Sequence, residues 1–313
     1  MTPNSQHTQQ RISGVCPVVE TPFTSEGEVD LASMERLLDH LYAVGVRQIM
    51  YPGYASEFYK LTDAERDALT QTVVQRFGSR EDTVVVISVP DHATRVAVER
   101  ARRAVELGAD MINILPPFLH GPSAAEVQAH VRAVLTAIAP VPAIVQYAPA
   151  QTGVALAPGV IAEMAAASPN LVQVKVESAP PGQFISALSA AAPLLDSVVG
   201  HAGVQLIDAR ARGAVGVQPG CSFSELYLRI WSHWDAGEPE RARALHARLL
   251  PFISYWMQGV ELIIAAEKWI SARRGIIASD HCRAPARQLD SEEIALLERF
   301  LAEFSEELSA VRS

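Results

Sequence analysis

Cysteine, positive charge and long apolar runs are all scarce in this sequence. Its 313 residues include three cysteines, Cys16, Cys221 and Cys282, which lie far apart and form no CxxC pair. This number and spacing predict neither a disulfide framework nor a structural zinc site. No apolar run approaches the roughly 18 residues of a membrane-spanning helix, and residues 1–13 lack the apolar core of a secretory signal. We therefore expect a cytoplasmic protein with no membrane partner.

The charge balance is acidic. Lysine and arginine number 26 and aspartate and glutamate 35, so the formal net charge is −9. A nucleic-acid or anionic-membrane surface needs a basic patch, so neither partner is expected. Apolar residues make up 49% of the chain, which is ample for a packed core. The length suits either two average domains or a single α/β barrel.

Short apolar, β-branched runs alternate with longer amphipathic segments. The runs have the length of buried parallel strands and are residues 15–19, 48–51, 83–87, 111–115, 143–147, 171–175, 197–200 and 214–217. The helical segments between them are residues 31–44, 63–77, 93–107, 124–138, 158–167, 183–192 and 204–211. Eight such units predict an α/β fold, the (β/α)8 TIM barrel. A doubly wound open sheet is the alternative, which the lack of GxGxxG after the first run disfavours.

The pattern divides the chain into three parts. Residues 1–13 are expected to form a flexible N-terminal tail, and residues 14–223 the barrel core. Residues 224–313 have a helical pattern throughout, with segments at 225–236, 239–257, 260–274 and 291–309. A single closing helix needs far fewer residues. We therefore expect a C-terminal helical extension that caps the barrel or makes subunit contacts.

Two candidate catalytic residues end neighbouring strands, where the active residues of such barrels lie. Lys175 ends the sixth run and shares a face with Gln173, whereas valines occupy the other face. Burial lowers the pKa of a lysine and makes its amine a nucleophile toward carbonyls. The alternative is a lysine that extends into solvent at a strand end. Tyr147 ends the fifth run, where its phenol either transfers protons or packs before a turn.

A glycine-led turn follows the second run. Gly53, Tyr54, Ala55 and Ser56 are placed where backbone N–H groups could hold a carboxylate. An ordinary turn, with the next residue, Glu57, capping a helix, is the alternative.

At these residues the chain resembles the dihydrodipicolinate synthase / N-acetylneuraminate lyase family. Residues 21–30 match the family's opening TPF…DG.VD pattern, and residues 53–57 match its Gly-Thr-Thr-Gly-Glu. Residues 147–153 match Tyr-Asn-x-Pro…Thr-Gly, shortened by one residue, and Lys175 falls on the Schiff-base lysine. The resemblance covers nearly the whole chain, with further matches at Leu61-Thr62…Glu65-Arg66, Gly108-Ala109-Asp110, Pro116-Pro117-Phe118 and residues 213–217.

The resemblance implies a (β/α)8 barrel with a C-terminal helical region, commonly assembled as a homotetramer, so that a homotetramer or homodimer is expected. It also implies class I chemistry without a metal or an organic cofactor. In that chemistry the lysine attacks the ketone of a 2-oxo acid, often pyruvate. The resulting iminium acts as an electron sink, so the adjacent carbon loses a proton or a C–C bond breaks. The tyrosine transfers the proton, and the backbone of the glycine-led turn binds the carboxylate.

Three departures from the family pattern argue against dihydrodipicolinate synthesis itself. Tyr54 and Ala55 replace a Thr-Thr pair, so the hydroxyl of the Tyr–Thr–Tyr proton relay is missing. Leu119 stands where the second relay tyrosine belongs. Gln151 replaces the arginine that binds the second carboxylate of the substrate.

Other features resemble the sugar-acid branch, which includes 2-keto-3-deoxy sugar-acid aldolases and dehydratases. The features closest to L-2-keto-3-deoxyarabonate dehydratase are residues 56–58, 145–149, 175–180 and the Arg273-Arg274-Gly275…Pro285 tail. The retained Tyr147 is instead typical of the aldolases.

Position in the barrel adds further pocket candidates. Gly200 and His201 end the seventh run, where His201 could meet the distal part of the substrate, act as a base, or simply open a helix at the surface. Gln218 follows the eighth run and could offer its backbone carbonyl. Glu177 could orient Lys175 or belong to a simple turn.

The sequence therefore predicts a class I lyase that acts on a small-molecule 2-oxo acid through a Schiff base. A 2-keto-3-deoxy sugar-acid dehydratase or a pyruvate-type aldolase fits best, since both reactions start from the same iminium. The alternatives are 4-hydroxy-tetrahydrodipicolinate synthase of the lysine pathway and a non-catalytic barrel that senses 2-oxo acids. The candidate site has no metal ligands and comprises the catalytic Lys175 and Tyr147 and the substrate-binding Gly53, Tyr54, Ala55, Ser56, Gly200, His201 and Gln218.

Overall fold

Strands and helices alternate along the chain, whose computed structural model describes residues 10–309. The strands form one eight-stranded sheet with the order β1-β8-β7-β6-β5-β4-β3-β2, and the pairs from β3 to β8 are parallel. This alternation and strand order confirm the predicted (β/α)8 barrel. By internal packing the described chain divides into two compact units, residues 10–14 with 84–218 and residues 15–83 with 219–309.

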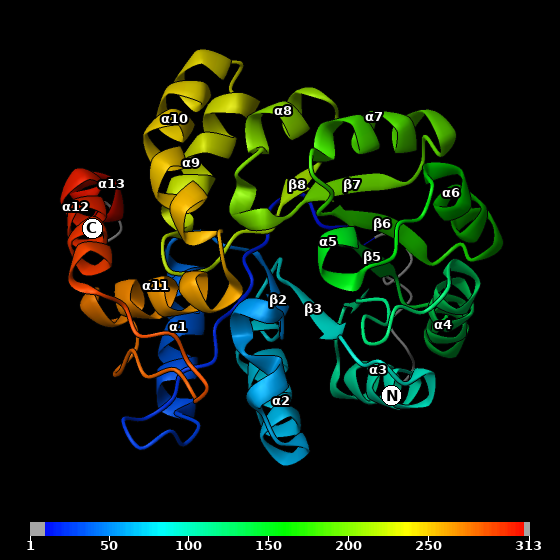
Figure 1. Cartoon of the computed structure of the whole chain (residues 1–313), viewed down its shortest axis with the longest axis horizontal. Helices are drawn as coiled ribbons and strands as arrows, with labels where there is room; N and C mark the ends of the chain where they lie inside the picture. Colours follow the sequence, from blue (N-terminus) through cyan, green and yellow to red (C-terminus); the bar gives the residue numbers. More distant parts are fainter. Residues whose placement is uncertain (1–9, 310–313) are drawn as a thin grey trace. The chain divides into compact units, whose positions relative to one another are not determined.

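The first unit contains most of the strands. These are β3 (Val84–Val89), β4 (Met111–Ile114), β5 (Ala143–Tyr147), β6 (Leu171–Val176), β7 (Asp196–Val199) and β8 (Gly216–Val217), while β1 (Gly14–Val15) begins where this unit meets the next segment. Its helices are α3 (Thr94–Leu107), α4 (Ala124–Ile138), α5 (Pro149–Thr152), α6 (Pro158–Ala167), α7 (Pro181–Ala191), α8 (Leu206–Ala211) and the 3-10 turn η4 (His201–Gly203). Figure 1 shows α3, α4, α6 and α7 following one another along strands β3 to β7.

The end of the expected N-terminal tail is docked onto this unit. The side chain of Ile12 is fully buried, and its backbone N–H donates to Gln173 Oε1 at 2.7 Å. Gln173 Nε2 in turn donates to the carbonyl of Ile12 at 2.8 Å. Arg11 Nη1 lies 2.6 Å from Asp196 Oδ2. Ordered chain therefore begins before the expected boundary at residue 13, and residues 1–9 of that tail lie outside the described residues.

The second unit combines the first βα segments with the C-terminal helices. Its elements are β2 (Gln48–Tyr51), α1 (Leu31–Ala43), α2 (Asp63–Phe77), the 3-10 turns η2 (Tyr54–Ser56) and η3 (Phe58–Lys60), α9 (Ser224–Asp235), α10 (Pro239–Trp256), α11 (Val260–Arg273), α12 (Ser291–Glu303) and α13 (Ser305–Ser309). The unit therefore does not follow the expected division at residue 223, because the C-terminal helices pack with residues 15–83. Among the described residues, none of the helices is both long and apolar enough to cross a bilayer.

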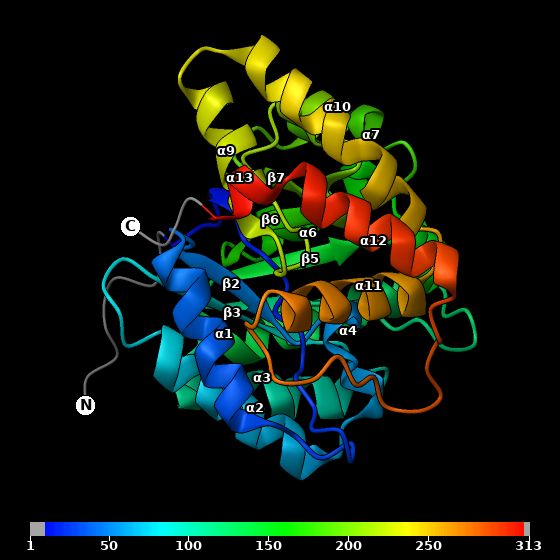
Figure 2. The ribbon, with the colours of Figure 1, turned by 90° about the vertical axis from the view of Figure 1, so that its left-hand side faces the viewer.

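Aromatic side chains hold the C-terminal helices of the second unit together. The ring of Phe300 on α12 lies 5.4 Å from that of Phe252 and 5.2 Å from that of Trp256, both on α10. Phe223, just before α9, lies 5.0 Å from Phe300. Figure 2 shows α10 and α12 running beside one another. This packing accounts for the helical extension beyond the last strand.

Two segments differ from their predicted secondary structure. The C-terminal region is not helical throughout, because residues 274–290 are irregular between α11 and α12. Gly275 leaves α11 with φ of 71°, and Arg283 Nε then donates to the carbonyl of Gly27 at 2.8 Å, so tertiary contacts fix this stretch. The first strand is shorter than residues 15–19. Pro17 has no N–H to donate, and Val18 forms only an isolated bridge with Met50.

Candidate active site

The side chain of Lys175 is buried at the end of β6. It is 4% exposed, which excludes the alternative of a lysine extended into solvent. The strand register pairs Lys175 with Gln146 on β5 and Val198 on β7. Its amine Nζ lies 3.3 Å from Glu177 Oε1. The site therefore contains a buried amine next to a buried carboxylate.

Several donors hold Glu177 as a carboxylate. Gln146 Nε2 donates to Glu177 Oε2 at 2.6 Å, and the backbone N–H of His201 donates to Oε1 at 3.3 Å. Burial alone would raise the pKa of Glu177. Lys175, His201 and Gln146 outweigh burial and hold that pKa below its usual value. An ionised carboxylate thus stands ready to exchange a proton with the amine.

A row of polar side chains crosses three neighbouring strands and ends at this carboxylate. Asn113 Nδ2 on β4 donates to Ser88 Oγ on β3 at 2.8 Å and to Gln146 Oε1 on β5 at 3.1 Å. Because the amide oxygen of Gln146 accepts from Asn113, its NH2 group faces Glu177. The row therefore fixes the orientation of Gln146 and, through it, of Glu177.

Tyr147 does not share the strand face of Lys175. Side chains alternate along a strand, so Tyr147 points to the face opposite that of Gln146. Its ring stacks on Phe184 of α7, with ring centroids 4.1 Å apart and an interplanar angle of 16°. Burial raises the pKa of its phenol. The structure thus differs from the expectation that the Tyr147 phenol adjoins the amine, and it puts the Gln146 side chain on the lysine's face instead.

The sequence contained a signal for this difference. In the family's Tyr-Asn-x-Pro pattern the tyrosine precedes the proline by three residues. Counted back from Pro149 without a deletion, that position is Gln146. The match to Tyr147 required a deletion of one residue between the tyrosine and Pro149, in the turn that follows β5.

Gly200 and His201 lie directly against Glu177. A Cβ atom at Gly200 would stand 2.2 Å from Glu177 Oε1, so only glycine permits this approach. His201 and Ala202 have φ of 50° and 48°, a region that residues other than glycine adopt rarely. The Nε2 atoms of His201 and Gln151 are 3.3 Å apart.

Gln218 is the last sequence-predicted residue of the first unit. It is buried and directly follows β8, and its backbone N–H donates to the carbonyl of Val199 at 2.8 Å. The substrate role of its own carbonyl stays a prediction.

The predicted carboxylate-binding residues lie in the second unit, where they form the turn after β2. The N–H of Gly53 donates to Ser56 Oγ at 2.8 Å, and Ser56 Oγ donates to the carbonyl of Val19 at 2.5 Å. A Cβ atom at Gly53 would lie 2.6 Å from a methyl group of Val18. Gly53 and Ser56 therefore hold the turn in shape. The carboxylate-binding prediction then rests on Tyr54 and Ala55 between them.

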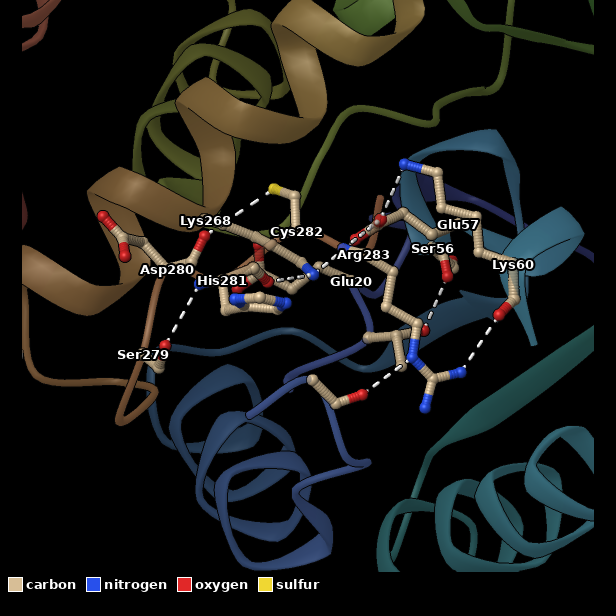
Figure 3. Close-up of polar contacts among 12 residues, drawn as sticks. Glu20, Ser56, Glu57, Lys60, Lys268, Ser279, Asp280, His281, Cys282 and Arg283 are labelled. Atoms are coloured by element: carbon tan, nitrogen blue, oxygen red, sulfur yellow. Dashed lines mark hydrogen bonds and ion pairs between the residues drawn. The ribbon is translucent and has the colours of Figure 1, made fainter. Parts of the chain in front are cut away.

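Glu57, the next residue, is the centre of a buried ion network (Figure 3). It also occupies the N-cap position of η3, but its side chain makes no capping hydrogen bond there. It is fully buried and forms ion pairs with Lys268 on α11 and, at 3.0 Å, with Lys60. The backbone N–H of Arg283 donates at 3.2 Å to Glu57 Oε2, the oxygen that also pairs with Lys60. Sequence reasoning missed Lys268 and Arg283, although a lysine within the apolar stretch of α11 was a visible signal.

Comparison with known proteins identifies the family. A family model described as the dihydrodipicolinate synthetase family matches residues 11–303. The chain belongs to this family. The predictions of the family and of a lyase are confirmed.

Two similar proteins of the family carry the names of different enzymes. An L-2-keto-3-deoxyarabonate dehydratase of Azospirillum brasilense is 31% identical over 296 residues, which cover 92% of this chain and 93% of that protein. A 4-hydroxy-tetrahydrodipicolinate synthase of Streptomyces coelicolor is 30% identical over 294 residues, which cover 90% of each.

Solved structures of the family share the fold. The dihydrodipicolinate synthase of Rhodopseudomonas palustris superposes with a TM-score of 0.86 at 24% identity and covers 93% of this chain and 97% of that one. A prophage protein of the family from E. coli K12, solved in complex with pyruvate, gives 0.85 at 22% identity and covers 95% and 99%. At these identities the likeness shows the family barrel and no more.

Proposed function

We propose that this chain is a class I dehydratase that acts on a 2-keto-3-deoxy sugar acid through a Schiff base on Lys175. The observation that carries the proposal is the buried pair of the Lys175 amine and the Glu177 carboxylate, 3.3 Å apart at the end of β6. A carboxylate at this distance accepts the proton that an ammonium group must lose before it attacks a ketone.

The reaction begins when the neutral amine of Lys175 attacks the C2 ketone. The ketone oxygen leaves as water after taking up the proton that Glu177 accepted from the ammonium group. Glu177 is then a carboxylate again, and an iminium joins Nζ to C2. A base then removes a proton from C3, and that C–H electron pair forms the C2=C3 bond of an enamine. The nitrogen lone pair next expels the C4 hydroxyl, which leaves as water after taking up a proton. Hydrolysis of the new iminium releases the 2-oxo-3-ene product and restores Lys175.

In this proposal Glu177 carries out the proton transfers at C3 and at the C4 hydroxyl. It is the titratable group at the amine, and Gln146 and His201 orient its two oxygens. Accepting the C3 proton makes it the acid that protonates the departing C4 hydroxyl. One group can therefore serve as base and then as acid, and Tyr147 is not needed for either step.

Three positions favour a sugar acid over the substrates of the lysine pathway. Gln146 stands on the lysine's strand face where the family pattern has its tyrosine, and Ala55 lacks the relay hydroxyl. The amide of Gln151, which lies 3.3 Å from His201, can donate to and accept from hydroxyl groups, whereas an arginine would suit a second carboxylate. The dehydratase of Azospirillum brasilense, 31% identical, supports the same substrate class.

The second candidate is 4-hydroxy-tetrahydrodipicolinate synthase, because a synthase of that name is 30% identical over 90% of this chain. A substrate panel separates the candidates. Purified protein is assayed with L-2-keto-3-deoxyarabonate and related sugar acids for dehydration and for pyruvate release, and with pyruvate and aspartate semialdehyde for condensation.

We expect dehydration of a sugar acid without release of pyruvate. Release of pyruvate would instead identify an aldolase. Condensation activity without turnover of any sugar acid would identify the synthase. If 2-oxo acids stabilised the fold without being turned over, and stabilised Lys175→Ala to the same extent, the protein would be a sensing barrel.

We also propose that Tyr54 and Ala55 bind the substrate carboxylate and that the protein assembles as a homotetramer or homodimer. The family resemblance supports both statements. Sedimentation equilibrium tests the assembly, and a monomer at micromolar concentration would contradict it.

A further inference from the structure

A second cluster of chemically active side chains is buried in the second unit. It consists of Glu20, which follows the Val18 bridge, Cys221, which follows β8, and Glu267 on α11. One atom from each, two carboxylate oxygens and a thiol sulfur, lie within 4.8 Å of one another. The three residues are at most 3% exposed. Three segments far apart in the sequence thus bring possible ligands to one point.

Three of the four carboxylate oxygens in this cluster lack hydrogen-bond partners. Within residues 10–309, neither oxygen of Glu20 has such a partner, and Oε1 of Glu267 has none either. The other oxygen of Glu267 accepts from the N–H and the hydroxyl of Ser222, at 2.9 and 2.5 Å. Those bonds fix the Glu267 carboxylate and leave Oε1 for the cluster. A buried, unpaired carboxylate is costly, so this arrangement calls for a counter-ion or a proton.

The cations close to the cluster are engaged by other groups. Lys268 forms its ion pair with Glu57 and donates to the carbonyl of His281 at 2.9 Å, although it lies near Glu20 (Figure 3). Arg274 contacts the carbonyl of Ser222 and pairs with Glu225.

The local backbone is shaped to admit the Glu267 carboxylate. A Cβ atom at Gly220 would stand 2.1 Å from Glu267 Oε1, so glycine at this position allows the approach. A single shared proton would join Glu20 and Glu267 by a direct O–H···O bond, but their oxygens do not hydrogen-bond to each other. The three atoms instead lie within 4.8 Å of one another, close enough to bind one ion.

We propose that Glu20, Cys221 and Glu267 bind a divalent transition-metal ion. The ligand set favours Zn²⁺ over Mg²⁺ or Ca²⁺, because a thiolate is a soft ligand and the latter ions prefer oxygen alone. The Cys221 thiol loses its proton to solvent as the metal–sulfur bond forms. The ion offsets two of the three negative charges on its ligands and ties the segment around Glu20, the loop after β8 and α11 to one another. Its role is structural and independent of Lys175.

The test uses tag-free protein, so that no affinity tag supplies ligands. The protein is loaded with Zn²⁺, dialysed against metal-free buffer and analysed for bound metal, and a parallel sample is loaded with Co²⁺. We expect one ion per chain and a thiolate-to-cobalt absorption band. Cys221→Ser should abolish the band and weaken Zn²⁺ binding at least roughly tenfold, and Glu20→Gln should weaken binding similarly. The matched control is Cys282→Ser, because the Cys282 thiol lies outside the cluster. This variant should keep the absorption band and the Zn²⁺ affinity.

Thermal unfolding gives a readout that does not depend on the variants. At free Zn²⁺ of 100 times Kd, Tm of the wild type should exceed that with chelator by about 5 °C. Wild-type protein that retains neither ion and shows no Tm difference would overturn the proposal, as would equal binding by Cys221→Ser. If the carboxylates hold only a proton, the wild type binds no metal and Glu20→Gln raises Tm.

Discussion

At the scale of single residues, the choice between Gln146 and Tyr147 decides which side chain works beside Lys175. The two are neighbours on β5, and the alternation of a strand sends them to opposite faces. Gln146 reaches Glu177 at 2.6 Å, whereas Tyr147 stacks on Phe184. In the proposed mechanism the proton-transfer role therefore moves from the phenol to the carboxylate.

Substitution of the two candidates distinguishes these roles. Tyr147→Phe keeps the stacked ring and should lower kcat by less than about threefold, because the hydroxyl takes no part in proton transfer. Glu177→Gln keeps the shape but removes the proton acceptor and should lower kcat by roughly 10² to 10⁴-fold. Steady-state kinetics on the dehydrated substrate provide the comparison, with circular dichroism as the check on folding. A large loss in Tyr147→Phe with little loss in Glu177→Gln would restore the tyrosine mechanism.

At the scale of elements, α11 carries charge into the interior of the second unit. Its residues Glu267 and Lys268 are adjacent and both buried, although the helix is otherwise mostly apolar. Lys268 also lies over the ring of Phe23 at 4.2 Å. Removing one member of a buried pair leaves an uncompensated charge, which costs far more than losing a surface pair.

Glu57→Gln should therefore destabilise the fold by about 3 to 5 kcal/mol, because it leaves Lys268 and Lys60 without their shared carboxylate. The matched control is Glu261→Gln. Glu261 also pairs with Lys60 but is 34% exposed, so we expect its loss to cost less than about 1 kcal/mol. Urea denaturation measures both changes. Equal effects for the two variants would show that burial of Glu57 has no energetic consequence.

The irregular segment after α11 is held by a pH-sensitive pair. Arg283 binds Glu65 and lowers the pKa of that carboxyl from 4.5 to about 2. A folded-state pKa below the unfolded one gives stability that is present above about pH 4.5 and is lost as the pH falls toward 2. The pair is partly exposed to solvent, so we expect its contribution to be about 1 kcal/mol.

The stability difference between wild type and Glu65→Gln should accordingly be largest near neutral pH. It should shrink as the pH is lowered from about 5 to 3, because protonated Glu65 resembles glutamine. Chemical denaturation at several pH values measures the difference. A difference that stays constant over this range would contradict the assigned ion pair.

At the scale of the whole molecule, local sequence patterns predicted most helices and strands, whereas tertiary contacts determined the irregular segments. The helices at residues 63–77, 124–138 and 158–167 have their predicted bounds, because amphipathic period and capping residues are local signals. Residues 274–290 are irregular because Arg283 contacts Gly27 and Glu65, which lie more than 200 residues away. No local pattern contains that information.

The candidate site divides in the same way. Lys175 was predictable, since a lysine among valines at a strand end combines a local pattern with a family motif. The role of Gln146 was not, because a one-residue shift in the match reverses the strand face. The cluster of Glu20, Cys221 and Glu267 joins three separate segments, so only the folded chain brings its atoms together.

Borohydride trapping addresses the proposed chemistry at its first covalent step. The protein is reduced in the presence of L-2-keto-3-deoxyarabonate or pyruvate, digested and analysed by mass spectrometry. We predict that the reduced adduct appears on the peptide containing Lys175 and that Lys175→Ala forms none. An adduct on a different lysine, or no adduct with any 2-oxo acid tested, would contradict the Schiff-base mechanism.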